Sequence, residues 1–380
     1  MKKYLLAPGP TPVPEAILQT MAEPMVHHRT PAFKEKVGKA IEGLKYVFQT
    51  KNDVLIFTAS GTGAMEGAVS NVLNPGDKAI IIRGGKFGER WGQIAEKFHA
   101  IPLYIDIEWG TAVDPAIVEK LLKENPDVKA VYTQLTETST CSLQPVQKLG
   151  EIVSKTNALL VIDAISGLGG QEFYMDDWKV DICVAGSQKG LMLPPGHAYA
   201  AVSEKAWKMI DDCKQSNYYF DWKKYRKKLA TNTDPYTGSV LHINGLIVAL
   251  DMIKERGLEN MFYQYQVLAK AVRAAIKALG LELYAHPSCD VATAIKVPES
   301  LDGQALVKNL RDKYGFTIAG GQEPIKGKIF RIAHMGYIEI FDIIAVISAL
   351  EIALNELGWK FTWGAGLTAA QEVLATEYKF

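Results

Sequence analysis

A glycine-rich segment, Ser60 to Ala64 (SGTGA), lies between the apolar run 54–58 and an amphipathic stretch. Glycines allow backbone N–H groups to approach an anion, and the N-terminus of a helix favours negative charge. The segment therefore favours a phosphate-binding loop. No Gly-Lys-Ser/Thr follows, which excludes a Walker loop. A plain tight turn and a nucleotide fingerprint remain alternatives, although the third glycine of the fingerprint, Gly67, comes one residue late.

An acidic residue, Asp163, closes the apolar run 158–162. Open α/β sheets bind ligands at the carboxyl ends of their parallel strands. A carboxylate at such an end is therefore a candidate functional group. The structural alternative is a helix cap for the next segment, residues 164–167.

A lysine, Lys189, lies in the segment Ser187 to Gly190 (SQKG), just after the apolar run 182–185. Burial beside a strand end disfavours the charged ammonium and makes the amine a better nucleophile. The alternative is a solvated loop lysine, which is the commoner situation for any single lysine.

Together these three segments predict a site for pyridoxal 5′-phosphate. This cofactor needs a phosphate-binding loop, an amine for its aldehyde, and a carboxylate that keeps its pyridine nitrogen protonated. The chain supplies them in the order loop, Asp163, Lys189, each at a predicted strand end. Because Asp163 and Lys189 are one short βαβ step apart, both side chains can approach the same ring.

The elements that must position these residues read as an α/β fold. Strand-sized apolar runs alternate with longer amphipathic segments, which is typical of βαβ units and a mostly parallel sheet covered by helices on both faces. The seven predicted strands are 54–58, 79–82, 103–107, 130–132, 158–162, 182–185 and 199–202.

The pattern changes after about residue 240, where two long helices joined at Gly257 precede two strands and two further helices. We therefore expect a smaller α+β domain at the C-terminal end. The expected division is an N-terminal arm (1–18), a large cofactor-binding domain (19–258) and a small domain (259–380). The sequence indicates no role for residues 361–380.

Composition narrows the class of partner. Lys plus Arg equals Asp plus Glu, 42 each, so charge gives no reason to expect a nucleic-acid or membrane partner. The four cysteines form no C-x-x-C pair and the histidines show no ligand spacing, so we expect no metal. No apolar run is long enough for a signal peptide or a membrane span. A cytoplasmic protein is expected.

The chain resembles the class V aminotransferases, especially the alanine–glyoxylate and serine–pyruvate or serine–glyoxylate group. The resemblance covers about residues 5–358 and implies the type I fold of pyridoxal-phosphate enzymes. The motifs that carry it are Ala7 to Pro10, Ser60 to Glu66, Glu137 to Thr140, Val161 to Ala164, Gly186 to Lys189 and Phe330 to Ile332.

The resemblance implies a role for each matching residue. Lys189 matches the Schiff-base lysine, Asp163 the pyridinium partner and Arg331 the arginine that binds the substrate carboxylate. The implied cofactor-binding residues are Thr62, Gly63, Ala64, Phe87, Thr138, Asp163, Ile165, Gln188, Lys189, Tyr236 and Ser239. Tyr236 and Ser239 match phosphate ligands from the neighbouring subunit, which implies a homodimer with the active site at the interface.

Two further residues have less certain counterparts in the family. Arg29 resembles a residue that shapes the substrate pocket from the partner chain, and its alternative is a surface charge. His334, three residues after Arg331, is a candidate pocket residue. The chain departs from the family at Leu135-Thr136, where His-Asn is common, and at Cys141, where Gly is common.

The implied activity is transfer of an amino group from alanine or serine to a 2-oxo acid such as glyoxylate or pyruvate, with ping-pong kinetics. Three alternatives stay open. The first is a pyridoxal-phosphate lyase or desulfurase on the same fold; a desulfurase would use a mobile cysteine, for which Cys141 is the candidate. A nicotinamide oxidoreductase would use Gly61-x-Gly63 and Arg83. A non-catalytic scaffold would have no need of Lys189, Asp163 and Arg331 together.

Overall fold

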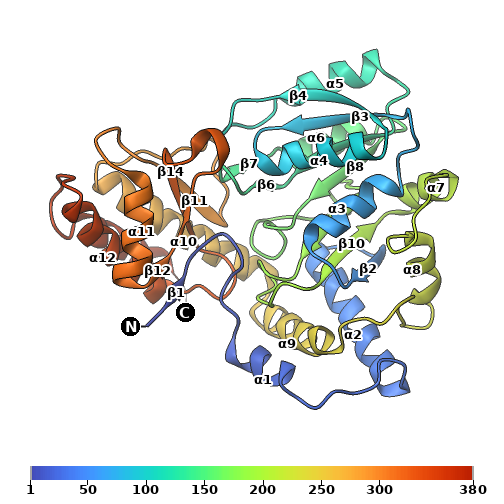
Figure 1. The fold of residues 1–380 in the computed structure, drawn as a ribbon, viewed down its shortest axis with the longest axis horizontal. Helices are drawn as coiled ribbons and strands as arrows, with labels where there is room; N and C mark the ends of the chain where they lie inside the picture. The colour runs from blue at the N-terminus through green and yellow to red at the C-terminus, as the bar shows by residue number, and fades with distance from the viewer. Residues whose placement is uncertain (1, 379–380) are drawn as a thin grey trace.

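A seven-stranded sheet forms the centre of the computed structural model, which describes residues 2–378 (Figure 1). Its strand order is β2-β10-β9-β8-β5-β3-β4, and β10 alone runs antiparallel to its neighbours. The strands are β2 (Asp53–Phe57), β3 (Lys78–Arg83), β4 (Ile101–Asp106), β5 (Ala130–Gln134), β8 (Leu159–Asp163), β9 (Ile182–Gly186) and β10 (Ala198–Val202). The prediction of a mostly parallel seven-stranded sheet is confirmed.

Helices cover both faces of this sheet. As a result, alternate residues of each strand are buried in two separate apolar cores. Leu55 and Phe57 of β2 face one core, whereas Val54 and Ile56 face the other. Such double burial explains the continuous apolar runs. The helices of this half are α1 (Glu15–Met21), α2 (Pro31–Phe48), α3 (Gly61–Ser70), α4 (Lys86–Lys97), α5 (Pro115–Glu124), α6 (Val146–Val153), α7 (Glu204–Asp212), α8 (Trp222–Leu229) and α9 (Val240–Arg256).

A three-stranded antiparallel sheet, ordered β11-β14-β13, organises the C-terminal half. Its elements are α10 (Leu258–Ala278), β11 (Ala292–Lys296), α11 (Gly303–Tyr314), β12 (Phe316–Thr317), β13 (Ala319–Gly320), the 3-10 helix η1 (Glu323–Ile325), β14 (Ile329–Ala333), α12 (Ile340–Glu356) and α13 (Ala365–Glu377). Helix α13 packs along α10 and α12, so most of the C-terminal tail is an ordered helix of this half.

The start of the chain joins the C-terminal half (Figure 1). Strand β1 (Tyr4–Leu5) pairs in parallel with β12, and Ala333 N–H donates to the Leu6 carbonyl. The chain then crosses to the large sheet, where Thr11 N–H donates to the Gln188 carbonyl at 3.1 Å. Residues 4–11 therefore connect the two sheets beside Lys189.

The parallel strands bring the candidate functional residues to one edge of the large sheet. Asp163 ends β8 and lies opposite Gln134, which ends β5. Lys189 follows β9 by three residues, and the glycine-rich segment follows β2 and opens α3. A two-stranded pair, β6 (Thr136–Glu137) and β7 (Ser142–Leu143), extends from the end of β5. Within residues 2–378, no helix combines the length and apolar character that crossing a membrane requires.

Candidate active site

Lys189 is buried in the turn after β9, with 9% of its surface exposed, so the solvated-loop interpretation is wrong. Its Nζ donates to the carbonyl oxygen of Pro8. Burial, together with a smaller effect of the nearby cation Arg331, lowers the pKa of Lys189 to about 8 against the opposing effect of Asp163. A substantial fraction of this amine is therefore neutral and nucleophilic near neutral pH.

The N-terminal arm lies directly over this amine. Gly9 has a φ of +112°, and a Cβ atom at Gly9 would lie 2.3 Å from Lys189 Nζ. The backbone conformation therefore favours glycine here, and a Cβ atom would also displace the flexible end of the Lys189 side chain. On the other side, Thr11 Oγ1 donates to the Lys189 carbonyl at 3.0 Å. The arm thereby limits the space above the lysine.

Asp163 is also buried, and its Oδ1 accepts a hydrogen bond from Ile165 N–H at 2.7 Å. Residues 164–167 form a turn and no helix begins there, so the helix-cap alternative is wrong and the bond stabilises the turn instead. Burial raises the pKa of Asp163 to about 7, and the carboxylate of Glu137 adds to the rise. Arg90 and Lys189 act in the opposite direction. The carboxyl group is therefore poised between its two protonation states near neutral pH.

The buried amine of Lys189 and the buried carboxyl of Asp163 form no ion pair with each other, since no N···O contact of 4.0 Å or less joins them. A buried charge without a partner is costly. A molecule that offers an aldehyde to the amine and a protonated ring nitrogen to the carboxylate would satisfy both groups. These residues therefore fit the predicted cofactor.

The glycine-rich segment forms the first turn of α3, as a phosphate-binding loop requires. A Cβ atom at Gly61 would lie 2.5 Å from Ile165 Cδ1, so the glycine allows Ile165 to contact the loop. Thr62 Oγ1 accepts a hydrogen bond from Arg90 Nη1 at 3.0 Å. Gln188 has a buried Oε1 atom without a hydrogen-bond partner among the described residues. The structure thus brings Thr62, Ile165 and Gln188 to the same region.

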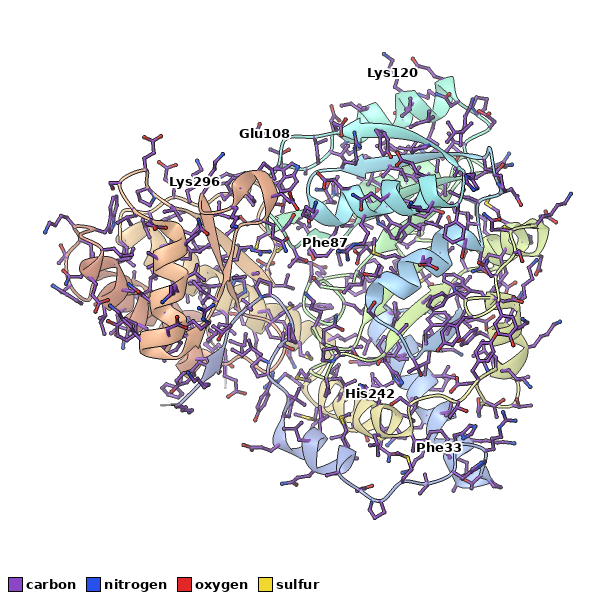
Figure 2. All side chains as sticks on the ribbon, viewed as in Figure 1. Phe33, Phe87, Glu108, Lys120, His242 and Lys296 are labelled. Carbon is purple, nitrogen blue, oxygen red and sulfur yellow. The ribbon has the colours of Figure 1, made fainter. Side chains whose placement is uncertain are left out.

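Phe87 lies on the first turn of α4, on the side of the large sheet that faces the C-terminal half (Figure 2). Arg90 lies over its ring, 4.9 Å from guanidinium carbon to ring centroid. The backbone N–H groups of Phe87 and Gly88 donate to Glu137 Oε2 at 3.1 and 3.0 Å. Glu137 therefore anchors the N-terminus of the helix that carries the predicted stacking ring, where a negative charge is favourable.

Glu137 and Arg90 were missed by sequence reasoning. Glu137 is completely buried and also accepts from Ser139 N–H at 3.1 Å and Ser139 Oγ at 2.5 Å. Burial raises the pKa of Glu137 above its ordinary value. The sequence signal for Glu137 was a carboxylate within the motif Glu137 to Thr140. Arg90 had no comparable signal, because its contacts with Thr62 and Phe87 depend on how α3 packs against α4.

Arg331 projects from β14 toward the large sheet and is 6% exposed. Its Nε and Nη2 donate to the Gly320 carbonyl at 3.2 and 2.7 Å, and its Nη1 donates to the Thr138 carbonyl at 2.6 Å. Three of the five guanidinium N–H groups are thus engaged, which leaves two for a carboxylate. Thr138 Oγ1 in turn hydrogen-bonds Ser166 Oγ at 2.5 Å. Arg331 is therefore held rigidly beside the predicted cofactor site.

Three predicted site residues form no hydrogen bond with this group within one chain. Arg29 is exposed and donates from Nε to His28 Nε2 at 3.2 Å. Tyr236 stacks on Tyr219, with ring centroids 5.0 Å apart. Ser239 begins α9, and its Oγ lies 2.8 Å from His242 Nδ1. The roles that the resemblance implies for them all involve a second subunit.

The structure also bears on the residues named for the desulfurase, for the nicotinamide oxidoreductase and for the pocket position at His334. Cys141 is completely buried, and burial raises the pKa of its thiol well above the ordinary value, so it is no mobile thiolate for a desulfurase. Arg83, the residue considered for a nicotinamide phosphate, forms a two-bond pair with Asp106 at 2.7 and 2.8 Å. His334 is not a pocket residue, because it is fully buried and hydrogen-bonds Thr293 Oγ1.

Comparison with known proteins identifies the family. The profile of the family Aminotransferase class-V matches residues 3–334. The chain is 40% identical to an uncharacterized aminotransferase of Methanocaldococcus jannaschii, over 99% of each chain. It is 39% identical to a Synechococcus protein named soluble hydrogenase, small subunit, over 99% of each chain. It is 34% identical to the serine–glyoxylate aminotransferase of Methylorubrum extorquens, over 98% and 96% of the two chains.

A solved structure agrees with these sequence relationships. The ureidoglycine–glyoxylate aminotransferase of Bacillus subtilis superposes with a TM-score of 0.93 over 99% of each chain, at 29% identity. Within residues 2–378, no group of three His, Cys, Asp or Glu side chains is arranged to hold a metal ion. The chain therefore belongs to the class V aminotransferases and is a pyridoxal-phosphate-dependent transaminase.

Proposed function

We propose that the enzyme transfers the amino group of a small, uncharged amino acid, alanine or serine, to a small 2-oxo acid such as glyoxylate or pyruvate. In this proposal Lys189 is the catalytic amine, Asp163 the partner of the pyridine nitrogen and Arg331 the carboxylate-binding residue. The observation that carries it is the presence of a buried amine and a buried carboxyl, not paired with each other, at one sheet edge beside a buried arginine.

The charges around Lys189 support a substrate with one carboxylate. The charged groups that act on its amine are Asp163 and Arg331. If Asp163 faces the cofactor, Arg331 remains as the cation for the substrate, and its two available N–H groups match one carboxylate. Pro8 and Gly9 of the N-terminal arm lie against the end of the Lys189 side chain. The relatives' names support glyoxylate as an acceptor.

When bound, pyridoxal phosphate supplies the electron sink that stabilises negative charge on the substrate Cα. Arg331 orients the substrate carboxylate and thereby fixes the Cα–H bond relative to Lys189. With its amine free, Lys189 Nζ would take the Cα proton as a general base, and its lowered pKa suits that role. Phe87 and Ile165 would contact opposite faces of the ring. Because the enzyme would retain the amino group after the first product leaves and before the acceptor binds, ping-pong kinetics are expected.

A substrate panel with an arginine variant tests this assignment. With glyoxylate and pyruvate as acceptors, we expect alanine and serine to be used with kcat/KM well above that of aspartate. Arg331→Lys should raise the KM for the amino acid by about 10- to 100-fold, because a charge-assisted two-bond contact is lost, and should leave cofactor affinity nearly unchanged. The control is Arg273→Lys, a partly buried arginine that donates to the Cys289 carbonyl. Equal loss of substrate and cofactor affinity, or a preference for aspartate, would contradict the proposal.

We also propose that the enzyme is a homodimer in which Tyr236, Ser239 and Arg29 complete the partner's site. The proposal is supported by the resemblance and by the lack of contact between these residues and Lys189 or Asp163 of the same chain. Light scattering should give a dimer mass.

Mixing inactive subunits tests the sharing of sites. Lys189→Ala and Tyr236→Phe/Ser239→Ala subunits, each inactive or impaired alone, should regain activity when they exchange, because one site of each mixed dimer contains only native residues. A monomer, or mixed dimers without any gain in activity, would refute the sharing of residues.

A further inference from the structure

Gln134, the last residue of β5, is a buried amide that the reaction described so far does not use. It is 1% exposed, and neither its Nε2 nor its Oε1 has a hydrogen-bond partner among the described residues. Leaving a buried amide unpaired costs on the order of 1–3 kcal/mol. Such an orphaned group calls for a partner in the functional state.

The position of Gln134 points to that partner. In the parallel ladder between β5 and β8, Gln134 lies directly opposite Asp163. Both residues are two positions after side chains of the same apolar core, Tyr132 and Val161, so they share one face of the sheet. A Cβ atom at Gly88 would lie 3.3 Å from Gln134 Nε2, which places the amide under the first turn of α4.

The carboxyl group of Asp163 has room for a further donor. Its Oδ1 accepts from Ile165 N–H, whereas its Oδ2 has no hydrogen-bond partner in the described chain. The charged groups that act on it are Glu137, which disfavours the ionised form, and Arg90 and Lys189, which favour it. The thiol of Cys183 is the other titratable group influenced by Asp163. A second N–H donor would stabilise the ionised carboxylate directly.

We propose that Gln134 is a positioning residue that donates from Nε2 to Asp163 Oδ2 and so holds the carboxylate ionised and aimed at the cofactor. The proposal rests on the proposed role of Asp163 as the partner of the pyridine nitrogen. Gln134 acts through Asp163 and has no part in proton transfer. The two residues are adjacent in the ladder and share one face of the sheet, so a rotation of the Gln134 side chain can bring its amide to the carboxylate.

Infrared titration of the cofactor-free enzyme tests the hydrogen bond. The Asp163 carboxyl signal is the difference between the native protein and Asp163→Asn. Gln134→Met, which keeps the side-chain length and removes the donor, should move the midpoint of this signal upward by about one pH unit or more. Thr133→Val is the matched control, because Thr133 is equally buried and unpartnered but lies on the opposite face of β5. It should leave the midpoint unchanged.

Cofactor affinity provides a second readout. Gln134→Met should weaken pyridoxal phosphate binding by about tenfold in the native background, which corresponds to one pH unit, and should have no effect in the Asp163→Asn background. If the methionine variant does not fold, Gln134→Asn, which keeps the amide on a shorter stem, takes its place in both measurements.

The outcomes separate the two proposals. If Gln134→Met behaves like Thr133→Val while Asp163→Asn impairs cofactor binding, the role of Gln134 is wrong and that of Asp163 stands. If Asp163→Asn binds the cofactor and turns over normally, the role proposed for Asp163 is wrong.

Discussion

Replacing Lys189 by alanine is expected to lower kcat by about 10⁴-fold or more and to abolish the visible absorption band that arises from the Schiff base between Lys189 and the cofactor. The variant loses both the amine that holds the aldehyde and the general base, and positioned proton transfer alone is worth about 10²- to 10⁴-fold. Steady-state assays with alanine and glyoxylate, together with absorption spectra, measure both effects. Added methylamine should restore part of the turnover, because it supplies a small base to the vacated space.

The matched control for this prediction is Lys205→Ala. Lys205 is a partly buried lysine at the opposite edge of the sheet, where it lies 3.6 Å from Asp181 and donates to the Ala158 carbonyl. Its removal should leave kcat and the spectrum near their native values. A Lys189→Ala enzyme with normal turnover would refute the assignment of the catalytic amine.

Asp163→Asn is expected to lower kcat by about 10²- to 10³-fold, the usual cost of removing one electrostatic partner from a buried site. The substitution keeps the shape of the side chain and the bond to Ile165 N–H, since the asparagine oxygen can accept it. What it removes is the negative charge that keeps the ring nitrogen protonated. The comparison variant is Glu137→Gln. Glu137 is a buried carboxylate that anchors α4 and is not proposed to contact the ring nitrogen, so its replacement should lower kcat less.

The same variant makes a prediction about stability without cofactor. The pKa of Asp163 is about 7 in the folded chain because of burial, against about 3.9 when unfolded. The folded state binds this proton more tightly than the unfolded state does. Protonation of Asp163 therefore stabilises the fold fully below about pH 4, and this stabilisation is lost as pH rises from about 4 through 7. The slope is at most about 1.4 kcal/mol per pH unit. Asp163→Asn should remove this slope, and an unchanged denaturation profile across that range would contradict the burial argument.

Much of the sheet could be predicted because parallel strands buried on both faces are continuous apolar runs. The runs at 158–162 and 182–185 differ from β8 and β9 by one residue at most at either end. The direction of β10 could not be predicted, because an apolar run such as 199–202 looks the same whichever way it pairs. The pairing of β1 with β12 could not be predicted either. The strand β1 has only two residues, which is too short for a periodic pattern, and its partners lie more than 300 positions away in the sequence.

The residues of the site also fall into those that the sequence predicts and those that it does not. Asp163 and Lys189 were predictable because each follows an apolar run, and strand ends of a parallel sheet converge. Gln134 was not, because a polar residue shows its burial and its partners only after the strands have packed. Glu137 was indicated only by its place in the motif Glu137 to Thr140, which does not show that it anchors α4. Arg29 depends on a second chain, which no pattern within one sequence describes. Residue type and strand position thus indicate the groups that bear the chemistry, whereas the groups that position them depend on tertiary packing.

The most direct test of the account is a crystal structure of the enzyme with pyridoxal phosphate. We expect continuous density between Lys189 Nζ and the carbon of the cofactor aldehyde. The Asp163 carboxylate should lie about 2.6–3.2 Å from the ring nitrogen, and the phosphate should contact the first turn of α3. A cofactor bound elsewhere, or Lys189 and Asp163 facing two separate cavities, would contradict the account.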